Sequence, residues 1–212
     1  MKKPMAVLLV VALLSAGSLT AGEESRPMFN GKDLSGWHVE GGTIQSWSLH
    51  DGILSCIAPG GGFLTTDSVY ADYELSLEWR IEADGNSGVG LRYPSDSHVS
   101  EAGMEIQILD DGAEIHKDIK PAQHTGSIYL QVAARQGAAT PVGEWNHYKI
   151  TCQGPLVVIV LNGQEVVRAD LDRETIGHEG LIPLSERPRS GHIGFQSHGT
   201  RVDFRNVRLK KL

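Results

Sequence analysis

A strict alternation of apolar and polar side chains over residues 72–82 constrains this chain more than any other feature. One face of that segment carries large apolar side chains, namely Tyr73, Leu75, Leu77, Trp79 and Ile81. A two-residue period is typical of a half-buried β-strand. Shorter alternating runs recur at residues 89–93, 104–108 and 148–152, with glycines between them. The pattern predicts about a dozen short strands in a sandwich or barrel, without a long helix.

Two dipeptides mark tight turns between predicted strands. Asn162-Gly163 separates two apolar runs, and Asp51-Gly52 interrupts another pair. Both favour the type I′ turn of a β-hairpin, because Asn, Asp and Gly tolerate positive φ angles. The segments 94–103, 110–125 and 170–190 lack strand periodicity, and we expect them to be longer loops.

The N-terminal residues have the layout of a secretory signal peptide. Two lysines precede an apolar run at residues 6–14, and mostly small residues follow as far as Ala21. The run is shorter than the roughly 20 residues that a transmembrane helix needs, so we expect cleavage rather than stable membrane insertion. Residues 1–21 are therefore predicted to direct export, to the periplasm or the medium. No linker or repeat divides the remainder, which predicts one domain over residues 26–212.

Charge and cysteine content exclude several classes of protein. The chain has 19 Lys and Arg against 26 Asp and Glu, a formal net charge of −7. Such a charge disfavours nucleic acids and anionic membranes as partners. Two cysteines, Cys56 and Cys152, are too few for a zinc site of four thiolates. Export would permit a disulfide between them, but two buried free thiols fit their apolar strand patterns somewhat better.

The polar faces of three successive predicted strands carry an unusual set of side chains. These are Glu78 and Arg80, then Arg92, then Glu105 and Gln107. Gly88 and Gly90 lie among them and leave room for a ligand, and a late strand adds His192, Gln196 and His198. Arginines, carboxylates and amides both donate and accept hydrogen bonds, which suits a hydroxyl-rich ligand. The set predicts a binding or catalytic face, and the alternative is an ordinary solvated sheet face with salt bridges.

Short motifs in a fixed order resemble a known family. They are FNGKDLSGW at 29–37, EWR at 78–80, NSG at 86–88, EIQILD at 105–110, TGSIY at 125–129, GEWN at 143–146, LNG at 161–163, GFQSHG at 194–199 and FRN at 204–206. Together they resemble the 3-keto-disaccharide hydrolase domain family from about Phe29 to Leu212. The resemblance implies an all-β fold, a concanavalin A-like jelly-roll β-sandwich of two curved antiparallel sheets.

The resemblance also implies a carbohydrate-active hydrolase that cleaves 3-keto-glycosides. A ketone at C3 of the sugar acidifies the proton on C2, so a general base can remove it. The group on C1 then leaves, and water adds to the resulting enone. This chemistry needs a base, a donor that stabilises the enolate oxygen, and an acid for the leaving group.

Particular residues are candidates for these roles. Glu105 is the candidate base, with a salt bridge to Arg80 or Arg92 as its alternative. Arg80 is the candidate donor to the enolate, and His198 the candidate acid because histidine titrates near neutral pH. The candidate substrate-binding residues are Glu78, Asn86, Arg92, Gln107, Tyr129, Trp145 and Gln196, of which Tyr129 and Trp145 could form a stacking platform.

No cofactor is certain from the sequence. Some members of the family are thought to use a divalent metal. Carboxylate oxygens of Glu78, Glu105, Asp110 and Asp111 could bind a hard cation such as Ca²⁺.

Two other functions fit the same residues. Jelly-roll glucanases of the laminarinase type carry Glu-x-Asp-x-x-Glu on one strand, whereas this chain has Gln107 and Asp110 at the second and third of those positions. A retaining glycosidase needs two carboxyl groups about 5–5.5 Å apart, and residues 105 and 110 face opposite sides of a regular strand. A non-catalytic, lectin-like glycan-binding module is the other alternative, because one fold serves both binding and catalysis.

Overall fold

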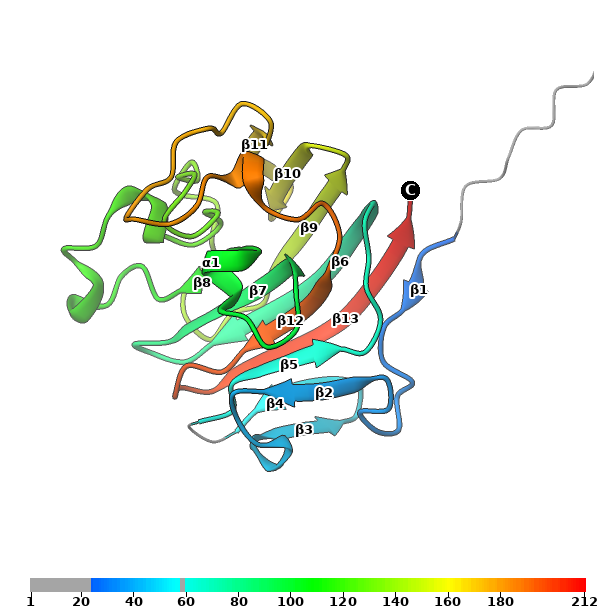
Figure 1. Cartoon of the computed structure of the whole chain (residues 1–212). Coiled ribbons are helices and arrows are strands. Elements are labelled where there is room, and N and C mark those ends of the chain that lie inside the picture. Colours follow the sequence, from blue (N-terminus) through cyan, green and yellow to red (C-terminus); the bar gives the residue numbers. More distant parts are fainter. Residues whose placement is uncertain (1–23, 58–59) are drawn as a thin grey trace, which may run out of the picture.

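Two antiparallel β-sheets pack face to face and form the body of the protein (Figure 1). The structure is a computed structural model that describes residues 24–57 and 60–212. The predicted signal peptide lies outside the described residues. Within the described residues, no helix is long and apolar enough to cross a membrane.

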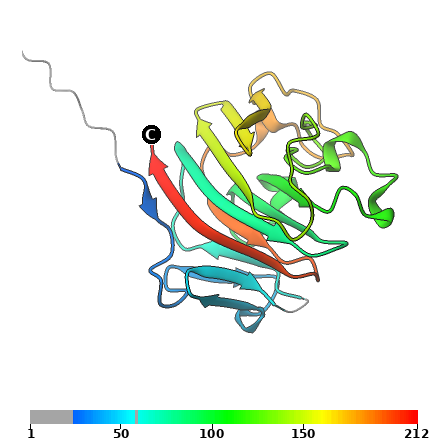
Figure 2. The same cartoon turned by 180° about the vertical axis from the view of Figure 1, so that it is seen from behind.

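The larger sheet has eight strands and lies nearer the viewer in Figure 2. Seven of its strands follow the order β11 (Gln164–Asp170), β10 (Leu156–Leu161), β9 (Asn146–Gln153), β6 (Tyr73–Ile81), β13 (Val202–Lys211), β4 (Ile53–Cys56) and β3 (Trp47–His50). The eighth, β1 (Arg26–Pro27), pairs with β13.

The smaller sheet has five strands, and its outer face is turned toward the viewer in Figure 1. Its order is β2 (Trp37–Glu40), β5 (Phe63–Thr66), β12 (His192–Gln196), β7 (Asn86–Tyr93) and β8 (Met104–Leu109). The short helix α1 (Val99–Ala102) and the 3₁₀ turns η1 (Ile44–Ser46), η2 (Glu114–His116), η3 (Pro121–Gln123) and η4 (Leu184–Glu186) lie in the connections. The predicted all-β fold is confirmed.

The core forms where the apolar faces of the sheets meet. Buried and partly exposed residues alternate along β6 as predicted, and all five of its large apolar side chains lie in the core. Both predicted hairpin turns are present. Asn162 and Gly163 have φ angles of 48° and 81°, and Asp51 and Gly52 have 49° and 74°, as a type I′ turn requires.

A β-bulge at Arg92 reverses the predicted facing of the end of β7. His192 on β12 pairs with Tyr93, but the next residue, Ile193, pairs with Leu91, so Arg92 is an extra residue in its strand. Arg92 has a φ of 53°, in the left-handed region. The prediction that Arg92 faces outward is therefore wrong: its side chain is fully buried and Tyr93 faces outward instead.

The buried Arg92 guanidinium connects the two sheets. It donates hydrogen bonds to the carbonyl oxygens of Ala71 and Gly154, both at 2.8 Å, and to Oδ1 of Asp72 at 3.1 Å. Asp72 Oδ1 also accepts the backbone N–H of Gly154 at 2.8 Å. These acceptors adjoin β6 and β9 of the larger sheet, whereas Arg92 belongs to the smaller one. Arg92 is therefore a structural residue and not part of a substrate-binding face.

The two cysteines are too far apart to form the disulfide that the sequence left open. Cys56 pairs with Val202, which also pairs with Ile81, whereas Cys152 pairs with Tyr73. They therefore lie at opposite ends of β6, about 26 Å apart at the usual rise per residue of a strand.

Replacing Arg92 should destabilise the protein strongly. We expect Arg92→Met to lower the free energy of unfolding by about 3 kcal/mol, because it removes the three hydrogen bonds of a fully buried guanidinium and leaves the Ala71 and Gly154 carbonyl oxygens and Asp72 without their donor. Urea denaturation monitored by circular dichroism measures the change. Arg173→Met is the matched control, since that side chain is 85% exposed, and it should change stability by less than about 0.5 kcal/mol. Equal effects of the two substitutions would contradict the structural role of Arg92.

Candidate active site

Four of the predicted site residues lie together on the outer face of the five-stranded sheet. They are Asn86 on β7, Glu105 and Gln107 on β8, and Gln196 on β12. On β8 they alternate with Met104, Ile106 and Ile108, which pack in the core. Gln107 Nε2 donates to Asn86 Oδ1 at 3.2 Å. The strand pairing β12-β7-β8 therefore brings three amide side chains and one carboxyl group to a single surface.

The Glu105 side chain lies directly over Gly88. A Cβ atom at position 88 would lie 2.3 Å from Oε1 of Glu105, so only glycine fits there while Glu105 keeps this position. The glycine thereby admits the carboxyl group into a close-packed layer. Glu105 is only 5% exposed as a result.

Burial changes the protonation of Glu105. Loss of solvation raises the pKa of its carboxyl group from 4.5 to about 8, against an opposing hydrogen bond from Gln196. Glu105 is therefore mostly protonated at pH 7 and exchanges its proton near pH 8. Gln196 Oε1 is itself buried without a hydrogen-bond partner among the described residues, which leaves an unused acceptor beside this carboxyl group.

Tyr129 lies beside this group, at the outer edge of β8. Its backbone N–H donates to the Glu105 carbonyl oxygen at 2.8 Å, and its hydroxyl accepts a hydrogen bond from Gln123 Nε2 at 3.1 Å. The backbone N–H of Gln107 likewise donates to the Ser127 carbonyl oxygen at 3.0 Å. The segment around Tyr129 thus covers the edge of β8 and holds Tyr129 next to the site.

Glu78 and Arg80 do not share this face, which corrects a prediction from the sequence. Both belong to β6 and lie on the outer face of the eight-stranded sheet, on the far side of the core (Figure 2). Two packed sheets are about 10 Å apart, so Arg80 forms no salt bridge with Glu105. The Arg92 guanidinium binds Ala71, Gly154 and Asp72 instead. The geometry also gives Arg80 no access to an enolate formed beside Glu105.

An ionic network on the larger sheet accounts for these residues. Arg80 Nε donates to Asp203 Oδ2 at 2.9 Å, and Arg205 Nε donates to Glu78 Oε2 at 2.7 Å. The guanidinium carbons of Arg80 and Arg205 lie 4.7 and 4.0 Å from the ring centre of Trp145. Trp145 therefore stacks on arginines of one sheet, whereas Tyr129 adjoins the other, and the two do not form one stacking platform.

His198 is exposed in the connection between β12 and β13, two residues beyond Gln196. Its role as a proton donor stays a prediction. Of the three predicted catalytic residues, Glu105 alone is built into the group on the smaller sheet.

The carboxylates suggested for a metal do not converge. Glu78 lies on the opposite sheet from Glu105. Asp110 accepts the backbone N–H groups of Asp84 at 2.9 Å and Gly112 at 3.1 Å, so it stabilises turns. Over residues 24–57 and 60–212, no group of three or more His, Cys, Asp or Glu side chains is placed to hold a metal ion. The residues present do not fit the metal that the resemblance suggested.

Tyr93 is a residue of this outer face that the sequence pattern missed. The Arg92 bulge turns it outward, where its hydroxyl donates to Thr65 Oγ1 at 2.8 Å. A Cβ atom at Gly194 would lie 2.1 Å from the Tyr93 hydroxyl, and one at Gly90 would lie 2.8 Å from its ring. Glycines on two neighbouring strands were the only sequence signal that a large side chain lies across them.

Comparison with known proteins identifies the family. The sequence profile of the 3-keto-alpha-glucoside-1,2-lyase-like domain matches residues 24–210. The chain belongs to this family. A Bacteroides thetaiotaomicron relative, named 3-keto-disaccharide hydrolase, is 27% identical over 226 residues, which cover 87% of this chain and 77% of the relative. The resemblance inferred from the motifs is confirmed.

Solved structures agree with this assignment to the lyase-like family. A candidate glycosyl hydrolase of Parabacteroides distasonis is 30% identical, with a TM-score of 0.79 over 89% of this chain and all of that one. A carbohydrate-binding module of Bacillus subtilis, CBM66, shares the fold alone, with 16% identity and a TM-score of 0.54 over 83% of this chain and 96% of that one. The predicted jelly-roll β-sandwich is confirmed, and the named relatives support a hydrolase-like, carbohydrate-related role.

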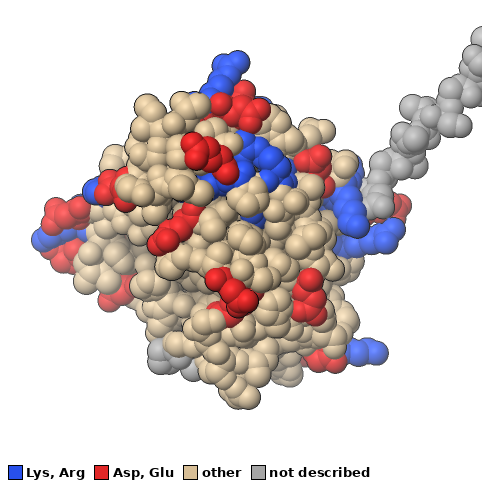
Figure 3. All heavy atoms as spheres, in the orientation of Figure 1, with Lys and Arg blue, Asp and Glu red and all other residues tan. Residues whose placement is uncertain are grey.

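The surface over the five-stranded sheet is mostly uncharged. Figure 3 shows separate acidic and basic groups on an otherwise neutral face. Neutral, hydroxyl-rich ligands such as sugars are compatible with such a surface, since they need hydrogen bonds rather than net charge.

Because the pKa of Glu105 is raised, the effect of Glu105→Gln on the stability of the protein should depend on pH. Between pH 4.5 and 8 the folded protein keeps a proton that the unfolded chain loses, so the stability of the wild type falls as pH rises through that window. Glu105→Gln does not titrate. We expect its stability relative to the wild type to increase by up to about 5 kcal/mol between pH 4 and pH 9.

Urea denaturation at the two pH values measures this difference. Glu82→Gln, at an exposed position, is the control and should differ from the wild type by less than about 0.5 kcal/mol at both. A pH-independent effect of Glu105→Gln would show that the carboxyl group titrates normally in the folded protein.

Proposed function

We propose that this protein cleaves glycosides whose sugar carries a ketone at C3, by elimination followed by hydration. Glu105 carries the proposal: it is a buried carboxyl group, set over Gly88 among three amides, in a chain of the 3-keto-alpha-glucoside-1,2-lyase-like family. The family description names a lyase and the Bacteroides relative is named a hydrolase. Elimination is the lyase step, and addition of water to its product gives the net result of hydrolysis.

The proposed reaction begins at C2 of the sugar. The Glu105 carboxylate removes the C2 proton, and the electron pair of that C–H bond forms an enolate with the C3 ketone. Collapse of the enolate forms the C1–C2 double bond and breaks the bond between C1 and the leaving oxygen, which takes up a proton. Water then adds its oxygen to C1 and a proton to C2. One water molecule is consumed for each glycosidic bond broken, and no redox change occurs.

The protein groups around Glu105 suit the remaining tasks. Amide N–H groups of Asn86, Gln107 and Gln196 can donate to the enolate oxygen and to sugar hydroxyls without a charged partner. A carboxyl group with a pKa of about 8 is well matched to proton transfer near neutral pH, because it takes up and returns the proton with little free-energy change. Glu105 itself can pass the C2 proton to the leaving oxygen.

The short helix α1 packs on the outer face at Gly90, the residue of β7 that pairs with Glu105. Val99 Cγ1 of this helix would lie 2.8 Å from a Cβ atom at Gly90, so α1 packs on the outer face of β7, next to β8. Arg187 holds the helix through 2.7 Å hydrogen bonds to the carbonyl oxygens of Ser100 and Gly103. We propose that this four-residue helix is displaced when substrate enters.

The test compares a 3-keto-glucoside with its unoxidised parent in D₂O. We expect turnover of the keto compound alone, with deuterium at C2 of the released sugar, because elimination and hydration exchange that position. Product is followed by proton NMR. Cleavage of the parent without deuterium at C2 would instead indicate double displacement, as in glucanases. Saturable binding without turnover of either compound would indicate a glycan-binding module.

Glu105 should control both the rate and its pH dependence. We expect kcat/KM to rise with pH and to level off above an apparent pKa of about 8, as the base form accumulates. Glu105→Gln should lower kcat by at least about 100-fold, the usual contribution of a general base, with KM little changed. Glu82→Gln should match the wild type. A rate that falls as pH rises through 8 would assign Glu105 as the acid and not the base.

Export is a separate proposal that rests on the N-terminal sequence. We propose that residues 1–21 are removed during secretion. Mass spectrometry of the full-length chain expressed in a bacterium should find a mature protein beginning near Gly22 in the periplasm or medium. Retention of the intact N-terminus in the cytoplasm would contradict export.

A further inference from the structure

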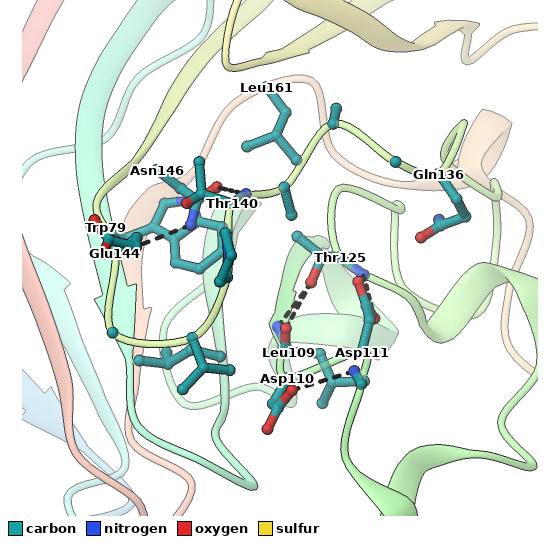
Figure 4. A pocket seen from close by; sticks show the side chains of 18 of the residues that line it. Trp79, Leu109, Asp110, Asp111, Thr125, Gln136, Thr140, Glu144, Asn146 and Leu161 are labelled. Atoms are coloured by element: carbon teal, nitrogen blue, oxygen red, sulfur yellow. Dashed lines mark hydrogen bonds between the residues drawn. The ribbon is translucent and has the colours of Figure 1, made fainter.

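A second candidate site is a pocket of about 450 Å³ at one end of the sandwich (Figure 4). Its apolar lining comes from the ends of three strands: Trp79 and Ile81 of β6, Leu109 of β8, and Leu161 of β10. A loop at residues 135–144 forms the opposite wall. Leu109 lies four residues beyond Glu105 on β8, about 13 Å along the strand, so the pocket is separate from the group around Glu105.

The loop wall is fixed by hydrogen bonds to the sheet. Asn146 Oδ1 accepts the backbone N–H of Thr140 at 2.9 Å and Asn162 Nδ2 at 2.7 Å. Asn162 Nδ2 also donates to the Ala138 carbonyl oxygen at 2.9 Å, and the N–H of Gly143 donates to the Ile81 carbonyl oxygen at 3.0 Å. The pocket is therefore shaped before any ligand arrives, which lowers the entropy lost on binding.

An unused hydrogen-bond donor lies in the lining. Trp79 is 2% exposed, and its indole Nε1–H has no hydrogen-bond partner among the described residues. Buried indole N–H groups normally have an acceptor, because loss of the bond to water is otherwise uncompensated. The N–H is covered in this structure, so a ligand oxygen would supply that acceptor after a small movement of the lining. This second observation, independent of the pocket's shape, points to a ligand that carries oxygens.

The polar lining limits the charge of that ligand. Three carboxylates, Asp110, Asp111 and Glu144, line the pocket against one cation, Arg135. Excess negative charge disfavours acidic sugars and phosphates, whereas carboxylates accept hydrogen bonds from hydroxyl groups. Thr125 and Thr140 add hydroxyls to the lining. An aromatic ring beside several hydrogen-bonding groups is the usual composition of a site for a polar organic ligand.

We propose that this pocket binds a sugar unit of a neutral saccharide, with the Trp79 indole N–H donating to a hydroxyl or ring oxygen. The pocket holds the glycan next to, but apart from, the Glu105 group. The proposal does not rest on the elimination chemistry, because it requires neither a ketone in the ligand nor a functional Glu105.

The experiment follows the indole N–H signals of the ¹⁵N-labelled full chain by NMR. Cellobiose and trehalose serve as probes, since both are neutral and carry no ketone, and glucuronic acid is the anionic comparison. The Trp79 signal is assigned from its loss in Trp79→Phe. We expect it to shift saturably with at least one neutral disaccharide at concentrations up to about 50 mM, above the millimolar range of weak binding. The Trp47 signal, from β3 at the far edge of the larger sheet and outside the pocket lining, should stay unchanged.

Two further variants keep the test decisive if Trp79→Phe folds poorly. Ala139→Trp fills the pocket from its exposed wall and should abolish the shift, while Ala133→Trp, exposed and outside the lining, should leave the affinity within about twofold of the wild type. Trp79→Phe itself should weaken binding about 5- to 10-fold, as the loss of one hydrogen bond predicts. No saturable shift with either disaccharide, a shift that survives Ala139→Trp, or tighter binding of glucuronic acid would each overturn the proposal.

Discussion

The packing of β6 against the five-stranded sheet determines how everything else in this protein is arranged. β6 lies in the middle of the larger sheet, and every second side chain along it is buried in the core. Because the sheets are packed through one face each, every strand has only one outer face for function. The molecule therefore has two outer surfaces separated by an apolar core. One carries Glu105 among amides, and the other carries Trp145 among arginines.

The raised pKa of Glu105 shows how packing and chemistry compete at one position. Gly88 leaves a space that a larger side chain would fill, and Glu105 occupies it with a group that prefers water. The fold tolerates the group by keeping it protonated. A carboxyl group kept neutral by its surroundings is unfavourable for stability above pH 4.5, yet that same environment makes it suited to exchange a proton near neutral pH.

The sequence predicted individual strands and turns well, but it predicted less well which strands share a sheet. Alternation along residues 73–81 identified the core face of β6, and Asn162-Gly163 and Asp51-Gly52 identified two hairpins, because these signals act within a few residues. Alternation does not specify which sheet a strand joins. β6 and β7 are close in sequence, yet the connection between them passes from one sheet to the other, so Glu78 and Arg80 lie far from Glu105. At Arg92 one extra residue reversed the facing of Tyr93, which no periodic pattern predicts.

The contacts of Arg92 also bear on how the sandwich opens. One guanidinium holds the end of β7 to the chain before β6 and to the turn after β9. Separating the sheets at this end would therefore break three hydrogen bonds at once. The Arg92 guanidinium would lose all the partners that compensate its burial. Amide hydrogens of β6, β7 and β9 near this end should then exchange with solvent as one cooperative unit rather than strand by strand. Slow amide exchange at this end, and faster exchange at the β3 and β11 edges, would be the dynamic signature of the Arg92 contacts.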